Sequence, residues 1–481
     1  MPSVNRQSLR EEFEAYKSRF KALSTDGKMS PEAQALFEGL LMLFELMIAI
    51  FLEKTTKKDN KNSSKPSSQT EKDETSKPGT KRKGRQENDD QFSNSRTRES
   101  VRIAKVTQCC HCAEDLSTAP AHTHERRTKI DIQFEKVIQH VDAEIKDCPV
   151  CHESTKGSFP SDMPGPLQYG TGIKAYILSM IMAQMVSLNR TQKMIKALIG
   201  VVISEATMLK YVAQLYWALE TWEAASIEHL LKQRALHVDE TSLRVDRRNQ
   251  WIHVYSAGEV TLKLLHTKRG SEAIEDFNII PRYGGTIIHD CWASYLAYNN
   301  CNHGLCGSHL LRELVFIIDS NGYAWASNMK RLLQQTCAKV AKRKRKKLTQ
   351  NEYANLQKRY RNIITRGENE MPPIPARSKG QRGRIAKSDA HNLLERLKLH
   401  EQAVLLFARD PSVSFTNNRA EQDLRMSKVK QKVSGCFRKE FYAKAYCRIS
   451  SYLQTMANKG HNPMMAIQMA LSGQIIAEMG E

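Results

Sequence analysis

Residues 235–266 read ALHVDETSLRVDRRNQWIHVYSAGEVTLKLLH and hold three apolar runs of strand length. The first run is closed by Asp239, and the others are WIHVYS (251–256) and TLKLLH (261–266). Gly258 between the last two can adopt the backbone of a tight turn, so the stretch predicts successive strands of one sheet. A strand end would hold the Asp239 carboxylate rigidly, although an Asp that merely forms a turn is the alternative reading.

Two more carboxylates stand at the end of a predicted strand or the start of a predicted helix. Asp290 closes the run GTIIH at 285–289, and Glu421 follows the cap-like segment FTNNRA at 415–420. Three acids on rigid elements can hold two Mg²⁺ ions, and two Mg²⁺ ions can cut and rejoin phosphodiesters. Glu421 also has a structural alternative, because Asn418 as N-cap with Glu421 three residues later fits a capping box.

The charge of the chain points to a polyanionic partner. Its 481 residues include 73 Lys and Arg against 52 Asp and Glu, which gives a formal net charge of +21. Nucleic acid is the expected partner of so basic a chain. The length allows roughly two to four domains.

The sequence around the three acids resembles that of the DDE transposases of insertion sequence family sixty-six. HVDETSLRVD contains Asp239, GGTIIHDCWASY contains Asp290, and FTNNRAEQDLRMSKVKQKVSGCFR contains Glu421. The resemblance runs from residue 105 to the C-terminus. It implies an α/β fold with a ribonuclease-H-like domain, in which helices flank a mixed sheet and the last acid lies on a helix.

Four cysteines in two pairs predict a metal site. Cys109 and Cys112 form one Cys-x-x-Cys turn, and Cys148 and Cys151 form another. Two such turns can hold one tetrahedral Zn²⁺, with His111 and His152 as substitute ligands, whereas four cysteines without metal are the alternative. Alternation in KIDIQFEKVIQHVDAEI (129–145) predicts strands, so 105–163 reads as a zinc-ribbon-like module. The resemblance implies a zinc-finger-like module here too.

A second cysteine motif, Cys306-x-x-His309, stands directly before an apolar helical pattern. It could be half of a metal site, but no second half stands near it in the sequence. The resemblance suggests that this motif packs beside the catalytic pocket. His237 lies two residues from Asp239 on the same predicted strand face, where it could tune the site or simply pack.

The N-terminal region reads as two helices, 7–22 and 31–55. The apolar stretch 36–52 contains Glu38 and Glu45 and is a poor membrane span. Its large apolar residues recur at helical spacing, which suits a coiled coil or an oligomerising helix, or a hairpin packed on its own body. These residues are Leu36, Leu40, Leu43, Met47 and Ile50. We expect no secretory leader, a cytoplasmic and nucleoid-associated protein, and no membrane partner.

Composition and periodicity divide the chain into eight segments. They are a helical segment, 1–55; a disordered linker, 56–104; the zinc-ribbon-like module, 105–163; a helical segment with a helix-turn-helix outline around Gly200 and Ser204, 164–232; the first part of the catalytic domain, 233–318; a basic helical insertion, 319–405; the last part of the catalytic domain, 406–445; and a helical tail, 446–481.

Basic side chains predict where DNA phosphates would bind. The run KRKRKK spans 342–347, and ARSKGQRGRIAK spans 376–387. Beyond Glu421, basic residues at i+4, i+7 and i+11 would form a stripe on the face of the acid. Solvated charge is the alternative in each case. The individual candidates are Lys342, Arg343, Lys344, Arg345, Arg425, Lys428 and Lys432.

The sequence therefore predicts a transposase that uses two Mg²⁺ ions for chemistry and one Zn²⁺ for structure. Its expected partners are double-stranded DNA at element ends and target, a homo-oligomer on DNA, and accessory proteins encoded by the same element. A ribonuclease-H-like nuclease or resolvase without strand transfer would use the same acids. A zinc-ribbon DNA-binding protein without catalysis is the other alternative.

Overall fold

The computed structural model of the chain describes residues 6–25, 29–59, 61–63, 100–132, 135–374 and 387–474. The chain divides into two compact units, one comprising 1–81, 223–431 and 436–438, the other 82–222, 432–435 and 439–481. Most of the predicted linker at 56–104 and nearly all of the basic stretch at 376–387 lie outside the described residues.

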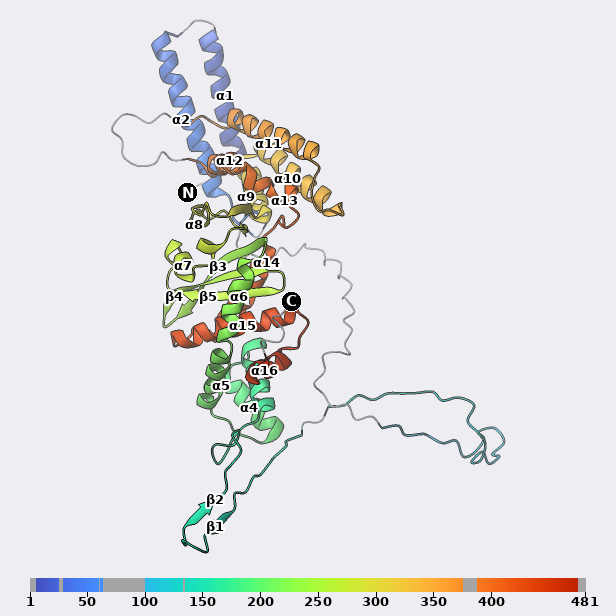
Figure 1. Ribbon diagram of the computed structural model, residues 1–481. Helices are drawn as coiled ribbons and strands as arrows, with labels where there is room; N and C mark the ends of the chain where they lie inside the picture. Colours follow the sequence, from blue (N-terminus) through green and yellow to red (C-terminus); the bar gives the residue numbers. More distant parts are fainter. Residues whose placement is uncertain are drawn as a thin grey trace. The chain divides into compact units, whose positions relative to one another are not determined.

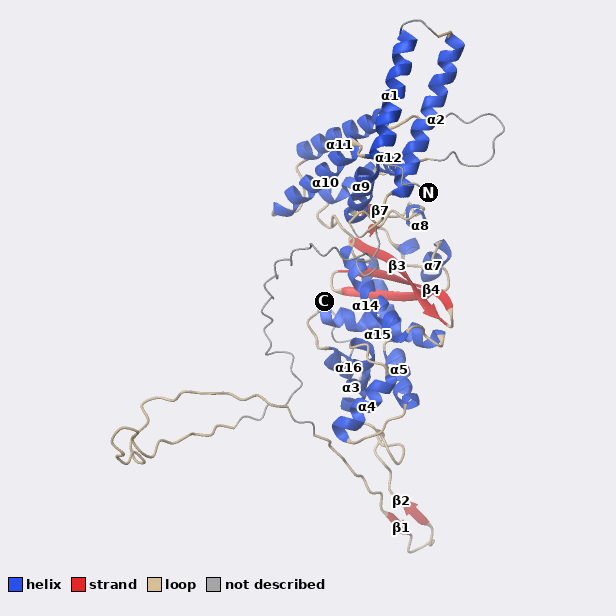
Figure 2. Ribbon diagram, turned by 180° about the vertical axis from the view of Figure 1, so that it is seen from behind, coloured by secondary structure: helices blue, strands red, loops and turns tan. Residues whose placement is uncertain are grey.

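A five-stranded mixed sheet is the centre of the first unit (Figure 2, red). Its strand order is β5-β4-β3-β6-β7, in which the first three strands are antiparallel and β6 and β7 run parallel to β3. This confirms the predicted α/β class with a mixed sheet. The strands are β3 (Ala235–Val245), β4 (Arg248–Ala257), β5 (Val260–His266), β6 (Thr286–His289) and β7 (Asn302–Leu305).

Positive backbone φ angles close both hairpins of the sheet. Asp246 and Arg247 have φ of 45° and 59° between β3 and β4, and Gly258 has φ of 53° between β4 and β5. Two successive left-handed residues form the turn whose twist matches two-residue hairpins. The predicted runs at 251–256 and 261–266 are therefore strands joined at Gly258, as the sequence indicated.

Alternation along β3 assigns its residues to the two faces of the sheet. Leu236 and Val238 are buried in an apolar cluster with residues of the helices α6 (Glu220–Leu231) and α7 (Ser271–Phe277). His237 and Asp239 point to the other face, where Asn417, just before α14 (Asn418–Ser434), hydrogen-bonds to His237. The carboxylate of Asp239 thus lies on the face that α14 covers.

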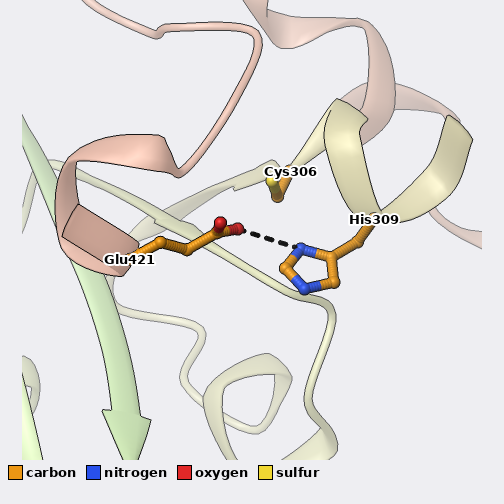
Figure 3. A group of neighbouring side chains, drawn as sticks. All are labelled: Cys306, His309 and Glu421. Carbon is orange, nitrogen blue, oxygen red and sulfur yellow. Dashed lines mark ion pairs between the residues drawn. The ribbon is translucent and has the colours of Figure 1, made fainter. Parts of the chain in front are cut away.

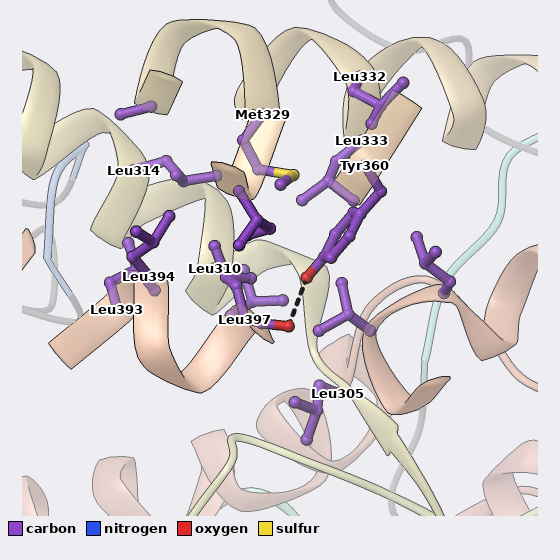
Figure 4. Packing of buried hydrophobic residues seen from close by; sticks show 14 of the residues in the cluster. Leu305, Leu310, Leu314, Met329, Leu332, Leu333, Tyr360, Leu393, Leu394 and Leu397 are labelled. Carbon is purple, nitrogen blue, oxygen red and sulfur yellow. Dashed lines mark hydrogen bonds between the residues drawn. The ribbon is translucent and has the colours of Figure 1, made fainter. Parts of the chain in front are cut away.

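Helices between β7 and α14 form their own apolar core (Figure 4). In it the Tyr360 hydroxyl donates a 2.9 Å hydrogen bond to the carbonyl of Leu397, in the last turn of its helix. Thr349 and Glu352 form a capping box at the start of another helix. The helices are α9 (Gly307–Asn321), α10 (Ala324–Lys342), α11 (Gln350–Glu370), α12 (Asp389–Leu399) and α13 (Glu401–Arg409).

The two predicted N-terminal helices are α1 (Arg6–Thr25) and α2 (Pro31–Thr55), an antiparallel hairpin (Figure 1). Only the C-terminal part of α2 is buried, and there the carboxylate of Glu53 accepts hydrogen bonds from the N–H groups of Asp389 and Ala390 at the start of α12. By length and composition α2 could cross a membrane, with a mean hydropathy of 2.2 in its most apolar window. One such helix near the N-terminus is weak evidence for a membrane protein.

The second unit is mostly helical. The predicted helix-turn-helix outline is observed, since α4 (Leu188–Ile199) ends at Gly200 with φ of 71° and Ser204 caps α5 (Glu205–Ala218). The ring of Trp222 meets that of Tyr452 edge to face at 5.3 Å. The other helices are α3 (Thr171–Leu178), the π-helix η3 (Ser179–Ala183), α15 (Glu440–Asn458) and α16 (Pro463–Leu471).

The predicted strands within 129–145 are wrong for the residues that the structure describes there. A two-stranded ladder forms instead at β1 (Ile145–Asp147) and β2 (Ser154–Lys156). Ile130 and Val137 are 91% and 84% exposed, so the alternating pattern has no layer to pack against. A strand needs a partner and a buried face, which periodicity alone does not supply.

Candidate active site

The first acid, Asp239, is carried by the central strand β3. Its neighbours Val238 and Glu240 point to the opposite face of the sheet, where Glu240 accepts hydrogen bonds from Arg269 and Tyr295. Glu240 therefore does not belong to the group of acids around Asp239, although it directly follows Asp239 in the sequence. The side chain of Asp239 accepts a hydrogen bond only from the backbone N–H of Glu240 within the described residues.

The second acid, Asp290, directly follows β6, which pairs in parallel with β3. Its carboxylate accepts a 3.2 Å hydrogen bond from the N–H of Trp292, and Cys291 between them has φ of 71°. A buried histidine, His289, accepts the N–H of Cys291 and so fixes the same turn. Because adjacent parallel strands end at the same sheet edge, this turn brings Asp290 towards Asp239.

The third acid, Glu421, lies in the first turn of α14. The helix begins at Asn418, so the capping box with Asn418 as N-cap is not formed. Asn417 instead ties the helix start to the sheet, because its side chain donates to the carbonyl of Val238 at 2.8 Å and bonds His237 at 2.9 Å. The carboxylate of Glu421 instead lies beside His309 and Arg312 of α9.

Buried polar contacts fix the rest of α14 on the sheet. Asp423 is 4% exposed and accepts hydrogen bonds from Ser256 at 2.6 Å and Thr261 at 2.8 Å. Arg419 of the same helix pairs with it at 3.1 Å. These contacts set the position of the helix, and hence of Glu421, relative to β4 and β5.

The three acids interact electrostatically. Burial, aided by the negative charges of Glu240, Asp290 and Glu421, raises the pKa of Asp239 to about 8. A carboxyl with so high a pKa carries its proton at neutral pH unless a cation replaces it. The structure thus brings together the three acids that the sequence singled out, on three different elements.

Side chains of α9 and its cap face Glu421, and Figure 3 shows two of them, Cys306 and His309. His309 Nδ1 lies 3.6 Å and the Arg312 guanidinium 3.7 Å from the same carboxylate oxygen. The thiol of Cys306 joins them, since its sulfur and the ligand atoms of His309 and Glu421 all lie within 4.8 Å of one another. The Cys306-x-x-His309 motif therefore does lie beside the site, and its partner is Glu421.

The match to a protein-family model decides the family. Residues 166–445 match the model of the family described as Transposase IS66 family. The chain belongs to the IS66 family of transposases. No curated protein matched the chain. A member of this transposase family is expected to process and bind DNA, which agrees with the basic composition of the chain.

In this IS66-family chain some of the predicted phosphate-binding residues contact other protein groups, and others are exposed. Arg343 is half-buried and forms an ion pair with Glu352, and Lys428 donates to the carbonyl of Ser242 at 2.6 Å. Both of these cationic groups are engaged by the protein itself. By contrast the side chains of four candidates are exposed: Lys342, Lys344, Arg345 and Arg425. Lys432 is exposed as well, in the last turn of α14.

The four cysteines of the predicted zinc site form two turns of the same design. The N–H of Cys109 donates to the carbonyl of Glu114, and that of Cys148 donates to the carbonyl of Glu153. Backbone N–H groups lower the pKa of both Cys109 and Cys148. Among the described residues, however, no three of the four sulfurs lie together.

Sequence reasoning missed the residues that hold the acids in place. Asn417 and Asp423 lie within the third sequence block, but nothing in their spacing distinguishes them from surface polar residues. Arg312 follows His309 by three positions, which places both on one face of α9. That spacing was the only sequence signal for this pair. It could not show that the start of α14, with Glu421, lies beside α9.

Proposed function

We propose that the chain is a DDE transposase in which Asp239, Asp290 and Glu421 hold two Mg²⁺ ions. The observation that carries the proposal is that β3, the turn after β6 and the start of α14 bring the three carboxylates close enough for Asp290 and Glu421 to act on Asp239, whose pKa burial raises first of all. Carboxylate oxygens are the ligands that Mg²⁺ prefers. The strand order, with three antiparallel strands followed by two parallel ones, supports a ribonuclease-H-like domain.

The side chains have separate tasks in the proposed reaction. Bound Mg²⁺ would activate a water or a DNA 3′-hydroxyl and stabilise the leaving oxygen. β3, β6 and α14 present the carboxylates from rigid elements, so little reorganisation is needed when the ions bind. No protein nucleophile is required, so the same site would serve both strand cleavage and joining of the 3′ end to target DNA.

Substitution of the acids tests this function. Asp239→Asn, Asp290→Asn or Glu421→Gln should each abolish Mg²⁺-dependent cleavage of DNA carrying the element ends and leave DNA binding nearly intact. The amides keep the shape but remove the charge that holds the ion. Asp246→Asn, in the β3–β4 turn, is the matched control and should cleave normally. Substantial cleavage by one of the three variants would remove that residue from the site.

A strand-joining assay separates the alternative enzyme. A nuclease or resolvase would show the same dependence on the acids and would not join a free 3′ end to target DNA. A DNA-binding protein without catalysis would show no metal-dependent nicking at all. We further propose that the transposase acts as a homo-oligomer on the two element ends, together with accessory proteins of the same element.

We also propose that the four paired cysteines bind one structural Zn²⁺. The support is the shared geometry of the two turns, in which N–H groups stabilise the thiolate form that metal binding requires. Full-length protein should contain about one zinc per chain through these residues. Chelation should then reduce DNA binding and change the circular dichroism, and neither change should follow in protein whose Cys109 and Cys148 are replaced by serine.

A further inference from the structure

The group Cys306, His309 and Glu421 has the composition and spacing of a metal site (Figure 3). Cys306 is the N-cap residue of α9 and His309 lies three positions later, so both side chains leave one helical turn on the same side. Glu421 comes from the first turn of α14. Two helix starts therefore supply a sulfur, a nitrogen and an oxygen ligand to one point.

The distances suit a small divalent ion. Two ligand atoms at ~2.1 Å from one tetrahedral ion are ~3.4 Å apart. His309 Nδ1 and Glu421 Oε1 are 3.6 Å apart, and all three ligand atoms lie within 4.8 Å of one another. The widest separation would have to shorten by roughly 1.4 Å for all three atoms to reach bonding distance.

The ligand atoms of His309 and Glu421 form no hydrogen bond in the described part of the chain, although the Arg312 guanidinium lies 3.7 Å from the Glu421 oxygen. His309 Nδ1 and Glu421 Oε1 are both buried and neither has a hydrogen-bond partner there. Buried polar atoms without a partner are costly, so such a pair calls for an explanation. A cation between them would satisfy both atoms at once.

The thiol of Cys306 is buried, and burial raises its pKa, so a metal ion that binds here must displace the proton. The Cys306 side chain accepts the N–H of Asn417 at 3.1 Å, and it stands at the positive end of the α9 helix dipole. The thiol is 1% exposed, so it is shielded from bulk oxidants. The N–H of Asn417 and the helix dipole would stabilise the thiolate once a metal ion had displaced the proton.

We propose that Cys306, His309 and Glu421 bind a borderline-soft divalent cation such as Zn²⁺, at a site that competes with Mg²⁺ for Glu421. A set of one sulfur, one nitrogen and one oxygen ligand selects Zn²⁺ over Mg²⁺, which prefers oxygen ligands. The effect on activity rests on the proposed function, because a Zn²⁺ ion bound to Glu421 would remove one of the three acids from catalysis. Zn²⁺ would thus inhibit the transposase.

Two charged groups face this site besides its ligands. The guanidinium of Arg312 lies 3.7 Å from Glu421 and would have to withdraw when a cation binds. The negative charge of Asp290 is close enough to act on His309 and would attract the cation. The fourth coordination position is left for water, as in zinc sites that are open to substrate.

Cobalt binding tests the site without relying on activity. Full-length protein is titrated with Co²⁺, and thiolate-to-cobalt absorption and bound cobalt per chain are measured. Because Cys109, Cys112, Cys148 and Cys151 also offer thiolates, the result is the difference between wild type and variant. Cys306→Ser should bind one Co²⁺ fewer per chain, whereas Cys337→Ser, a half-buried cysteine of α10, should match wild type.

His309→Gln provides a second variant if the buried substitution prevents folding, because His309 is partly exposed. It should keep the thiolate absorption but weaken this binding step by about tenfold or more. Cobalt stoichiometry and absorption that are the same in wild type, Cys306→Ser and His309→Gln would overturn the proposal.

Inhibition by Zn²⁺ is measured separately on Mg²⁺-dependent nicking. Micromolar Zn²⁺ should inhibit wild type, and the remaining nicking of His309→Gln should need about tenfold more Zn²⁺ for the same inhibition. Equal sensitivity of the two proteins would contradict the competition for Glu421. If wild type nicks no DNA at all, the proposed function fails while the cobalt result still decides the metal site.

Discussion

Gly307 illustrates how one residue determines the distance between two helix starts. A Cβ atom at this position would lie 2.3–2.6 Å from ring carbons of Phe415, far closer than any van der Waals contact. The N–H of Gly307 also donates to the carbonyl of Phe415 at 2.7 Å. Only glycine lets the start of α9 lie this close to the chain that leads into α14 and Glu421.

Replacing Gly307 should therefore harm both stability and catalysis. We expect Gly307→Ala to cost about 1–3 kcal/mol, because the well-packed Phe415 ring must move. The shift should displace Glu421 and reduce cleavage by more than the loss of folded protein explains. Thermal unfolding and cleavage rates per folded molecule measure this, with Gly172→Ala as control, since a Cβ there meets no atom within 4 Å. Wild-type behaviour of Gly307→Ala would contradict the packing argument.

The raised pKa of Asp239 predicts a pH-dependent affinity for Mg²⁺. Below a pKa of about 8 the carboxyl keeps a proton that the ion must displace. Apparent Mg²⁺ affinity should rise about tenfold per pH unit up to pH 8 and then level off. Calorimetric titration between pH 6.5 and 9 measures it, and Asp239→Asn should bind weakly at every pH. An affinity that falls with rising pH would exclude this explanation.

The same shift has a consequence for stability in the absence of metal. Asp239 binds its proton more tightly in the folded state, since its usual pKa is 3.8. Its contribution to stability is therefore complete below that usual value and is lost as the pH rises through about 8. Bound Mg²⁺ should remove this loss, so the ion should raise the melting temperature more at pH 8 than at pH 6.

At the scale of elements, the position of α14 depends on Asp423. Its buried carboxylate accepts hydrogen bonds from Ser256, Thr261 and Arg419, which belong to β4, β5 and α14 itself. The apolar face of α14 is small, with Leu424 and Ala420 as its buried apolar residues. Polar contacts therefore contribute an unusual share of the attachment of this helix.

Asp423→Asn should loosen α14 and lower catalysis without touching the three acids. We expect a loss of about 2–3 kcal/mol, because hydrogen bonds to a charged acceptor disappear and an amide N–H₂ group faces the hydroxyl donors. Cleavage should decrease even at temperatures where the protein is folded. Gln422→Ala, at an exposed position of the same helical turn, serves as the control and should change neither quantity.

At the scale of the whole molecule, the turn after α10 carries a run of exposed basic side chains. Lys342, Lys344 and Arg345 are exposed there, whereas Arg343 pairs with Glu352. Replacing the three exposed residues with glutamine should weaken binding to element ends and to random DNA alike. The slope of log affinity against log salt should flatten by about 0.9 for each DNA phosphate that the variant no longer neutralises. Arg343→Gln is the control and should leave that slope nearly unchanged.

Loss of preference for the element ends with an unchanged salt slope would instead make this turn a reader of sequence. Phosphate contacts carry no sequence information, so the two outcomes exclude one another. Chemistry on DNA that is already bound should change little in the triple variant, because none of the three residues contacts the acids.

The N-terminal hairpin carries a row of exposed apolar side chains on α2. Leu36, Leu40, Leu43 and Met47 of α2 are between 42% and 66% exposed. Apolar residues at this spacing on one helix are typical of a coiled-coil seam, which would bury them against a second copy. We expect Leu40→Ser combined with Leu43→Ser to shift the protein towards monomer in sedimentation, while Glu38→Gln should not. Wild-type protein that is monomeric yet binds vesicles would contradict this assignment.

The sequence by itself determined what depends on local pattern. The hairpin at Gly258, the helix ends at Gly200 and Ser204, and the three acid-bearing segments follow from turn chemistry, caps and apolar periodicity. The long blocks around Asp239, Asp290 and Glu421 were also specific enough to indicate the family. The alternation of apolar and polar residues at 129–145 gave a wrong prediction. It predicted strands, but among the described residues these segments have no partner strand.

Only the tertiary structure decided how the acid-bearing segments combine. Asp239 and Glu421 are 182 positions apart, and no periodicity relates a strand to a helix so distant in sequence. Asn417, Asp423 and Gly307 set the meeting of β3, α9 and α14 through buried contacts that no spacing rule reveals. The same contacts place Glu421 beside the Cys306-x-x-His309 motif. The sequence could not show this, because Glu421 is far from the motif along the chain.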